Sequence, residues 1–383
     1  MSTPKESIGN KNNIKVCHMT SAHPRYDQRI LYRECVSLYD AGYDITLLVN
    51  DEMENETIKG VNIKSTKRNF KGKRFKRMLS GVNEIYKMAK KEDADIYHFH
   101  DPELMRIATR LKRKGKVVVY DSHEIYYLQI KEKNYLPKLI RNLIAKIYVW
   151  YENYVLKRID GVIFPVKTDK IDFGSKTKRV AYVNNMPRND ELPSIQEKNS
   201  IEQCLCYTGG LTYARGIYQL AEAAHIAGIP LYLAGVFESD EFKNKILGNN
   251  EDNMVRYLGV LSREEVYRLY QKCTIGVSTL LKIGQYAIMD NLPTKVYEYM
   301  AIGLPVILSD IPYNRSVIEE YGIGMLVNPD QPEDIAEKIT YLLAHPDEMK
   351  AMGEKGKQLV LTEWNWSKEE EKLLWLYKEI LEK

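Results

Sequence analysis

Side chains whose types and spacing could do chemistry are concentrated in residues 290–309. Asp290 is followed by Lys295 and Glu298, and then by the apolar run 305–308. A lysine in the first turn of a helix opposes the helix dipole, so Lys295 is unfavourable there unless an anion lies in front of the free N–H groups. A phosphate would supply that charge, and a carboxylate one turn later could accept hydrogen bonds from the hydroxyls of a ribose. An ordinary Lys/Glu pair on a solvated helix would give the same pattern.

The same stretch predicts the elements that would position these side chains. Asn291 can cap a helix, Pro293 suits its first turn and Gly303 can end it. The apolar run 305–308 predicts a buried strand, and residues 274–281 predict another strand before the loop, which gives a βαβ unit. Ligands of such units lie at the carboxyl ends of the strands, so we expect a binding site there.

The spacing of these residues resembles the donor-site signature of the family 4 retaining glycosyltransferases. The signature consists of an acid, seven further residues, a glutamate and then Ala-x-Gly-x-Pro-Val. Asp290, Glu298 and segment 301–306 match it in this order. The Pro-x-Lys-x-x-Glu-Tyr variant at 293–299 is similar to bacterial members that build surface polysaccharides. The likeness extends over nearly the whole chain. It implies the GT-B fold, an α/β architecture of two Rossmann-like doubly wound domains facing a cleft.

The resemblance also implies roles for residues around the donor. Asp290 would meet the sugar hydroxyls, with a reach one methylene shorter than that of the usual glutamate, and Glu298 would hold the ribose. The implied donor-binding set consists of two glycines, an arginine and the residues around the helix start: Gly209, Gly210, Arg215, Asp290, Asn291, Leu292, Pro293, Thr294, Lys295 and Glu298.

Residues 207–218 read as a strand, a glycine turn and the start of a helix. Gly209 and Gly210 let the backbone approach a ligand, and Arg215 can donate two N–H bonds to a diphosphate. The segment is similar to the family's Gly-Arg-Leu-x-x-x-Lys-Gly, in which both cations face the donor pyrophosphate. Here Gly210 stands in place of the first cation, so Lys295 is our candidate for the missing charge. A plain glycine turn, with the arginine pairing a nearby acid, is the alternative.

His123 follows the predicted strand 117–121, so its side chain should lie at the carboxyl end of the sheet. It resembles the histidine that family members place beside the donor sugar, although an isolated histidine in such a loop is more often structural. The candidate catalytic residues are therefore His123, Asp290, Arg215 and Lys295.

The loop after the first strand resembles a variant found in a subset of the family. Asp27 and Arg29 match its Asp-x-Arg-Ile pattern, and the resemblance places this loop beside donor and acceptor. Asp27 would either orient the acceptor hydroxyl or cap the following helix and pair with Arg29. His100 and Asp101, which follow another strand, complete the expected acceptor-side set.

No metal is expected from the pattern of ligand residues. His98 and His100 share one face of a predicted strand, but a metal site needs further ligands, and the sequence has no HExxH or comparable set. We therefore expect metal-independent transfer and no cofactor besides the nucleotide-sugar substrate.

At 383 residues the chain exceeds what one core usually covers, and alternating strands and helices predict two parallel sheets. The expected N-terminal, acceptor-side domain is 1–190 and the nucleotide-sugar-binding domain is 191–365, with a linker near 184–200. The resemblance implies that the final helix, 366–383, packs back on the first domain.

No window is apolar enough to span a membrane and no signal peptide is evident, so we expect a cytoplasmic protein with five reduced cysteines.

Charge is divided unevenly between the two halves. Residues 1–190 carry 37 basic and 23 acidic side chains, whereas the whole chain has a net charge of only +4. A basic cluster interleaved with apolar residues suits an anionic membrane surface on the inner face of the cell membrane better than nucleic acid, although it can also be a solvated face. The cluster is Lys67, Arg68, Lys71, Lys73, Arg74, Lys76 and Arg77. Apolar residues at helical spacing in 135–156 form a second candidate membrane surface, although packing of that helix against the domain core would explain much of the stripe equally well.

The sequence thus predicts a retaining transferase that moves a hexosyl unit from a nucleotide diphosphate sugar, most simply a UDP-sugar, to a saccharide or lipid-linked saccharide. Charge that develops on the departing diphosphate would be stabilised by Arg215, Lys295 and nearby N–H groups. A UDP-GlcNAc 2-epimerase and a non-catalytic sugar-nucleotide-binding protein are the alternatives. A dinucleotide oxidoreductase is disfavoured, since no Gly-x-Gly-x-x-Gly follows the first strand of either half.

Overall fold

The computed structural model describes residues 14–382 apart from 71, 73, 124, 132–136, 166, 168–175, 190–201, 249–251 and 288–289. The chain forms two compact units, one of Met1–Asn185 with Ser367–Lys383 and one of Met186–Trp366. The first unit therefore contains the C-terminal helix. Most of the expected linker lies outside the described residues.

The first unit is built on one twisted sheet, in which every neighbouring pair is parallel except the edge pair β3–β4. Its strands, in spatial order, are β3 (Glu56–Ile58), β4 (Val61–Ser65), β2 (Asp44–Val49), β1 (Lys15–Met19), β5 (Ile96–Phe99), β6 (Val117–Asp121), β7 (Gly161–Phe164) and β8 (Val180–Tyr182). Sequence analysis did not predict β3, β4 or β8. All three lie at or next to an edge of the sheet. β3 and β8 have only three residues each, too few to show a clear periodicity.

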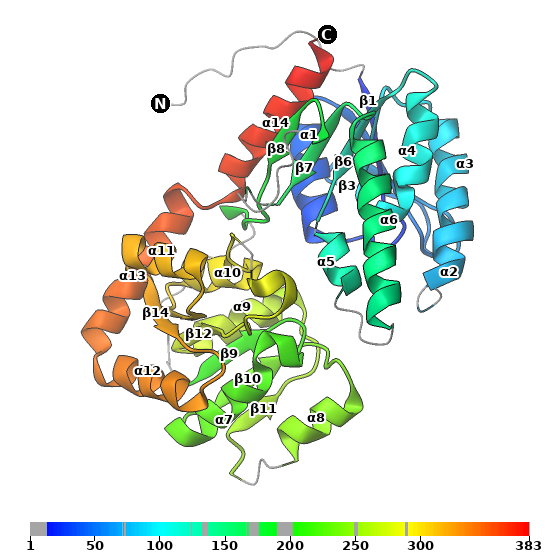
Figure 1. The fold of residues 1–383 in the computed structure, drawn as a ribbon. Coiled ribbons are helices and arrows are strands. Elements are labelled where there is room, and N and C mark those ends of the chain that lie inside the picture. The colour runs from blue at the N-terminus through cyan, green and yellow to red at the C-terminus, as the bar shows by residue number, and fades with distance from the viewer. Residues whose placement is uncertain are drawn as a thin grey trace, which may run out of the picture. The chain divides into compact units, whose positions relative to one another are not determined.

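Helices cover both faces of this sheet (Figure 1). One core contains Met19 of β1 and Phe99 of β5, packed with residues of α3 (Val82–Glu92), α4 (Met105–Lys112) and α6 (Lys138–Leu156). Side chains alternate along a strand, so His18 and His98 face the opposite side. That side is covered by η1 (Gln28–Cys35), which has π-helical hydrogen bonding, by α1 (Val36–Asp40) and by α14 (Trp366–Leu381). Short helices α2 (Arg74–Lys76), η2 (Arg77–Gly81), η3 (Pro102–Leu104) and α5 (Tyr126–Lys131) complete the unit.

The second unit has a fully parallel sheet. In spatial order its strands are β11 (Val255–Tyr257), β10 (Leu231–Ala234), β9 (Leu205–Thr208), β12 (Ile275–Ser278), β13 (Val306–Ser309) and β14 (Gly324–Val327). The strand order runs outward in both directions from β9 and β12. The crevice at such a reversal, outside the carboxyl ends of the strands, is where open α/β sheets bind ligands.

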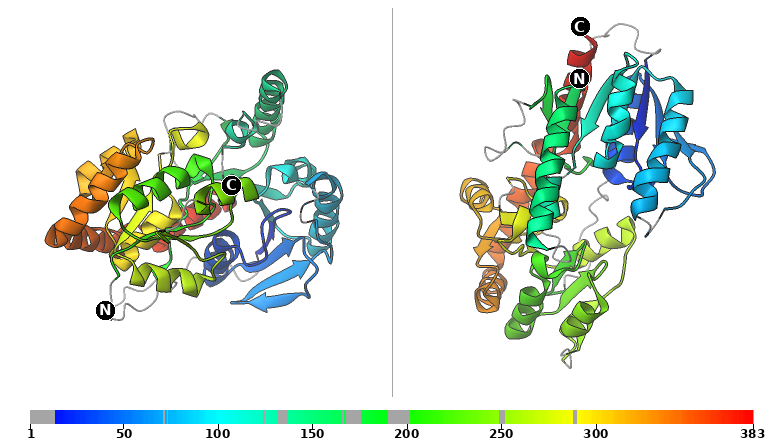
Figure 2. Two further views of the ribbon diagram at one scale, coloured as in Figure 1. Left: turned by 90° about the horizontal axis from the view of Figure 1, so that it is seen from below. Right: turned by 45° about the vertical axis from the view of Figure 1, so that its right-hand side comes forward.

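Two separate cores lie on the two faces of this sheet, so it is doubly wound as predicted (Figure 2). One core lies under α7 (Ile217–Ala227), α8 (Asp240–Leu247) and α12 (Pro332–Ala344) and includes Leu220, Phe242 and Ile335. Leu269, Met300 and Leu359 represent the other core. It lies under α9 (Arg263–Lys272), α10 (Thr294–Ile302), α11 (Pro312–Tyr321) and α13 (Pro346–Thr362). Within the described part of the chain, no helix combines the length and the apolar character that crossing a bilayer requires.

Candidate functional site

Helix α10 begins differently from our prediction. It starts at Thr294 with Pro293 in the cap position, and Asn291 lies too far back to cap it. The Oδ1 atom of Asn291 is buried and accepts no hydrogen bond from the described residues. Gly303 ends the helix as expected, because its φ of 80° is a left-handed conformation that glycine adopts readily. Without a side-chain cap, the first N–H groups of α10 keep their capacity to bind an anion.

Lys295, in the first turn of α10, is a buried cation. Its side chain lies at the carboxyl edge of the second sheet, and the residue is only 9% exposed. The Nζ atom has no hydrogen-bond partner among the described residues and lies 3.3 Å from the centroid of the Tyr207 ring, a cation–π contact. Burial and then the nearby Arg215 guanidinium hold the pKa of Lys295 well below its usual range. An anion at this point would relieve both effects.

Arg215 and Lys295 converge on the glycine loop that follows β9. A Cβ atom on Gly209 would lie 3.3 Å from Nη1 of Arg215 and 3.4 Å from Nζ of Lys295, so only glycine leaves the space in front of both cations open. Arg215 is held by its Nε donating to the Tyr286 hydroxyl at 3.2 Å. The next residue is Gly216, where a Cβ would meet the Thr279 carbonyl oxygen at 1.9 Å. Two like charges directed at one glycine turn make a site for a doubly charged group such as a diphosphate.

Glu298 is buried on the same helix but does not pair with Lys295. Its Oε1 accepts from Nη1 of Arg263 at 2.7 Å, and its Oε2 accepts from the Tyr270 hydroxyl at 3.2 Å. The alternative of a solvated Lys/Glu pair is therefore wrong, because both residues are buried and the carboxylate has another cation. Sequence analysis missed Arg263. The Ser262/Glu265 capping box places the start of its helix but gives no sign of which residue the arginine contacts.

The remaining donor-set residues lie around these groups. Asp290 is half-buried. Burial of Tyr313, and after it the nearby Asp290 carboxylate, raises the pKa of Tyr313 to about 12. Leu292 is buried in the core below α10, so only its backbone could contact a ligand. Pro293 and Thr294 are partly exposed, and Gly210 lies beside the Arg215 guanidinium. The structure thus brings the predicted donor set together in the second unit.

His123 belongs to the first unit and is held by two neighbours. Its Nε2 lies 2.9 Å from Oδ2 of Asp121 and 3.2 Å from Nδ1 of His100. The Asp121 carboxylate is buried, and burial is outweighed by Arg29 and His123, which together hold its pKa well below the usual range. A carboxylate that accepts from Nε2 fixes the orientation of the ring, as expected for a histidine that positions a hydrogen bond.

The acceptor-side assignments of Arg29, His100 and Asp101 need correction, whereas a contact of the partly buried Asp27 with an acceptor stays a prediction. Arg29 is buried and donates to both oxygens of Asp121, at 2.8 and 2.9 Å. Asp27 accepts from the backbone N–H groups of Arg29 and Ile30, so of its two predicted roles the structure shows the helix cap, without the side-chain pair. His100 is fully buried with both ring nitrogens against protein groups. Buried, fully engaged side chains support the site and do not meet an acceptor directly.

Asp101 is likewise a support. Its Oδ2 accepts from the Thr20 hydroxyl at 2.8 Å and from the Ser21 N–H at 2.6 Å, and its Oδ1 lies 3.0 Å from Nδ1 of His23. These contacts hold the loop after β1 in place. Sequence analysis did not single out this network, because its members are about 80 residues apart and only the parallel pairing of β1 with β5 brings them together.

The basic cluster is partly neutralised by acidic neighbours. Arg77 pairs with Glu103 at 2.8 Å, and Lys67 pairs with Glu54. Arg68 lies 3.5 Å from Glu84. Lys71 and Lys73, and the side chain of Arg74, are outside the described residues. The cluster therefore offers less free positive charge than its sequence indicates.

Comparison with protein families gives two adjacent matches. Residues 28–181 match the family described as "Glycosyltransferase Family 4", and residues 188–359 match "Glycosyl transferases group 1". The boundary between the matches lies near the boundary between the two units. Together the matches take in the candidate donor site and the loop that carries His123.

Sequence relatives agree with these matches. An uncharacterised glycosyltransferase of Methanocaldococcus jannaschii is 22% identical over 72% of this chain and 71% of its own length. The D-rhamnosyltransferase WbpZ of Pseudomonas aeruginosa is 24% identical over 72% of this chain and 70% of its own.

Two solved structures share the fold over almost the whole chain. Sucrose-phosphate synthase from Thermosynechococcus elongatus superposes with a TM-score of 0.74 at 17% identity, covering 96% of this chain and 99% of its own. HepE from Anabaena, solved in complex with UDP and glucose, gives a TM-score of 0.68 at 12% identity, covering 96% of this chain and 100% of its own. These likenesses show a common fold.

Proposed function

The chain belongs to the family 4, group 1 glycosyltransferases with the GT-B fold, and from that premise we propose that it transfers a hexosyl unit from a UDP-sugar with retention of anomeric configuration. The acceptor we propose is a saccharide or lipid-linked saccharide of surface polysaccharide synthesis. Support comes from HepE, which was solved with UDP and glucose, and from WbpZ, which is named as a D-rhamnosyltransferase.

One observation carries the donor proposal: Lys295 and Arg215 converge on Gly209, and among the described residues neither cation forms a salt bridge with a carboxylate. In the transfer, the bond between the anomeric carbon and the diphosphate oxygen breaks, and its electron pair remains on the diphosphate. Both cations and the N–H groups at the start of α10 would stabilise that developing charge without a metal.

The other donor contacts follow from the same pocket. Glu298, held by Arg263 and Tyr270, would accept from the ribose hydroxyls through the lone pairs that its protein partners leave free. Asp290 would accept from hydroxyls of the sugar. His123, whose Nε2 is engaged by Asp121, would present its other ring nitrogen to the sugar as a hydrogen-bond acceptor when the ring is neutral.

Calorimetric binding of two ligands, UDP and inorganic pyrophosphate, to matched variants tests the donor site. Lys295→Met should weaken the binding of UDP and of inorganic pyrophosphate alike, because it removes a contact with the diphosphate. Each Kd should rise at least tenfold. Glu298→Gln should weaken the binding of UDP but leave the Kd of pyrophosphate unchanged, because Glu298 is proposed to contact only the ribose. Equal UDP affinity in wild type and Lys295→Met would refute the proposed site.

The reaction class is tested by mixing the enzyme with UDP-sugars and following the products by NMR. Retention predicts that the new glycosidic bond has the anomeric configuration of the donor, and an inverted product would overturn that part. UDP-GlcNAc alone should remain unchanged, whereas a 2-epimerase would convert it without acceptor. A protein that binds UDP but turns over no donor would be the non-catalytic alternative, which the family matches disfavour.

We also propose that the first unit associates with an anionic membrane surface through α6. Leu139, Leu143, Ile147 and Trp150 recur every three or four residues along this helix, and all four are more than half exposed. Lys138 and Lys146 of the same helix are also exposed. An apolar stripe flanked by lysines is the pattern of helices that lie in a lipid headgroup region.

A further inference from the structure

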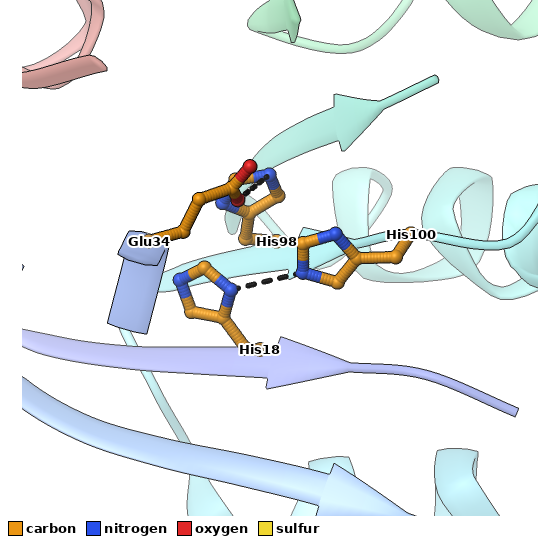
Figure 3. Close-up of side chains that lie close together, drawn as sticks. All are labelled: His18, Glu34, His98 and His100. Carbon is orange, nitrogen blue, oxygen red and sulfur yellow. Dashed lines mark hydrogen bonds and ion pairs between the residues drawn. The ribbon is translucent and has the colours of Figure 1, made fainter. Parts of the chain in front are cut away.

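Four polar side chains far apart in the sequence meet on the face of the first sheet that η1 and α14 cover. They are His18 of β1, Glu34 of η1, and His98 and His100 at the end of β5. All four are fully buried. Figure 3 shows the three imidazoles and the carboxylate turned toward one another. Neither the donor site nor the hydrogen bond of His123 to Asp121 requires this cluster.

The spacing of the ligand atoms fits one metal ion. Nδ1 of His18 lies 3.0 Å from Nε2 of His100, and Nε2 of His98 lies 3.7 Å from Oε2 of Glu34. One ligand atom from each of the four residues lies within 4.8 Å of the others. Four ligands at about 2.0–2.1 Å from a tetrahedral zinc ion are about 3.3–3.4 Å apart. The His18–His100 and His98–Glu34 separations lie on either side of that value, and side-chain rotations would have to draw these two pairs together from within the 4.8 Å limit.

Unsatisfied atoms point to the same place. Within the described part of the chain, Nε2 of His98 and both carboxylate oxygens of Glu34 are buried without a hydrogen-bond partner. Oε1 of Glu34 forms an ion pair with Nε of Arg29 at 3.0 Å, and Arg29 is shared with Asp121. A cation bound between Glu34 and His98 would supply the missing positive charge and the missing ligand contact.

The atoms that would not bind the metal all have partners, as metal-ligating histidines usually do. Nδ1 of His98 lies 2.9 Å from the Tyr377 hydroxyl, and Nε2 of His18 lies 3.5 Å from the same oxygen. Nδ1 of His100 lies 3.3 Å from Oδ2 of Asp121. Each imidazole therefore has one nitrogen on an outer oxygen and the other directed at the cluster centre, which is the arrangement that fixes tautomer and ring orientation at a metal.

We propose that His18, Glu34, His98 and His100 bind one zinc ion as a closed structural site. Imidazole and carboxylate ligands suit zinc, and four protein ligands leave no open position for a substrate. The ion would join β1, β5 and η1, and it would fix His100, whose Nδ1 lies 3.2 Å from Nε2 of His123. Sequence analysis expected no metal, because the ligands are scattered at positions 18, 34, 98 and 100 and match no short motif.

Metal analysis of tag-free, full-length protein tests the proposal without any activity measurement. Cells grown with added zinc should give about one zinc ion per chain after gel filtration in metal-free buffer. X-ray absorption of that protein should show three imidazoles and one carboxylate around zinc. A folded wild-type protein with less than a tenth of an equivalent of any transition metal, and no rise in Tm when zinc is added, would overturn it.

Variants locate the ion. His98→Asn and Glu34→Gln should each lower zinc content at zinc-limited growth by at least tenfold. His123→Asn is the matched control and should keep its zinc, because His123 belongs to the neighbouring group with His100 and Asp121. Loss of zinc in His123→Asn with retention in His98→Asn would assign the metal to that second group and contradict the proposal. If the cluster variants do not fold, the absorption spectrum of the wild-type protein still decides.

Discussion

Nζ of Lys295 lies 3.3 Å from the centroid of the Tyr207 ring, buried and with no acceptor among the described residues. The aromatic face is a weak partner for a fully desolvated ammonium group. Tyr207 in turn is itself buried, and that burial raises its pKa to about 12. The lysine is therefore held in a position that costs folding free energy, as expected of a residue placed for an anionic ligand.

Replacement of this lysine should separate stability from activity. Lys295→Met keeps the length of the side chain and removes the buried charge, so the free energy of unfolding should stay equal or rise by about 1–3 kcal/mol. Glycosyl transfer should fall by about 100-fold or more in kcat/KM. Urea denaturation and initial rates measure the two effects. Lys338→Met, which replaces a partly exposed lysine paired with Glu337 at 2.7 Å, is the control and should change neither. A Lys295→Met protein that is destabilised yet active would contradict the assignment.

Glycine at position 209 should be required for donor binding. Gly209 has a φ of 119°, and a Cβ there would intrude between the two cations. Gly209→Ala should therefore weaken UDP binding by at least tenfold in calorimetry.

Gly228→Ala provides the comparison, because Gly228 also has a positive φ, of 65°, but its Cβ would meet nothing within 4 Å. Its backbone strain should lower the free energy of unfolding by about 1 kcal/mol while UDP affinity stays unchanged. Equal loss of affinity in both variants would mean that strain, and not the cation pocket, explains the effect.

Because of His23, the free energy of unfolding should fall as the pH rises into the alkaline range. Hydrogen bonding to Asp101 outweighs burial and raises the pKa of His23 from 6.5 to about 9. The charged groups that influence the ring are Asp101, Asp27 and Asp121, and the His123 ring packs against it at 4.5 Å between centroids.

A raised pKa in the folded state means that His23 contributes stability fully below pH 6.5 and loses it as the pH rises through 9. The ring is 24% exposed, so we expect a loss of about 2 kcal/mol over that interval. Urea denaturation of wild type and His23→Gln between pH 6 and 9.5 measures it. Parallel pH profiles for the two proteins would show that the ion pair contributes nothing.

His123 should affect turnover more than donor affinity. The proposed diphosphate and ribose contacts all belong to the second unit, so His123→Ala should leave the Kd for UDP unchanged while kcat falls by about 100-fold. His225→Ala, which removes a half-exposed histidine paired with Asp252, is the control. Normal kcat in His123→Ala would leave this histidine with a structural role only.

The apolar stripe of α6 should determine binding to anionic vesicles. The double variant Leu143→Ser/Trp150→Ser should reduce flotation with vesicles that contain phosphatidylglycerol, because two exposed apolar side chains no longer enter the headgroup region. Val260→Ser, which changes an exposed apolar residue of the second unit, should float like wild type. Equal binding to neutral and anionic vesicles would argue against a contribution from the lysines.

The sequence by itself predicted the fold class and the candidate donor-site residues, because those signals are local. The alternation of strands and helices follows hydrophobic periodicity within each segment, and Lys295 and Glu298 are one helical turn apart on α10. Gly303 ends that helix because of its own backbone freedom. Such features need no knowledge of what packs against them.

The tertiary structure alone decided which side chains meet. Sheet pairing sets His18 beside His98, and α14 brings Tyr377 to both of them from the far end of the chain. The same long-range packing gave Glu298 its partner Arg263 and Arg29 its partner Asp121. Contacts between residues tens or hundreds of positions apart depend on strand order and helix packing, for which no short stretch of sequence carries a periodic or motif signal.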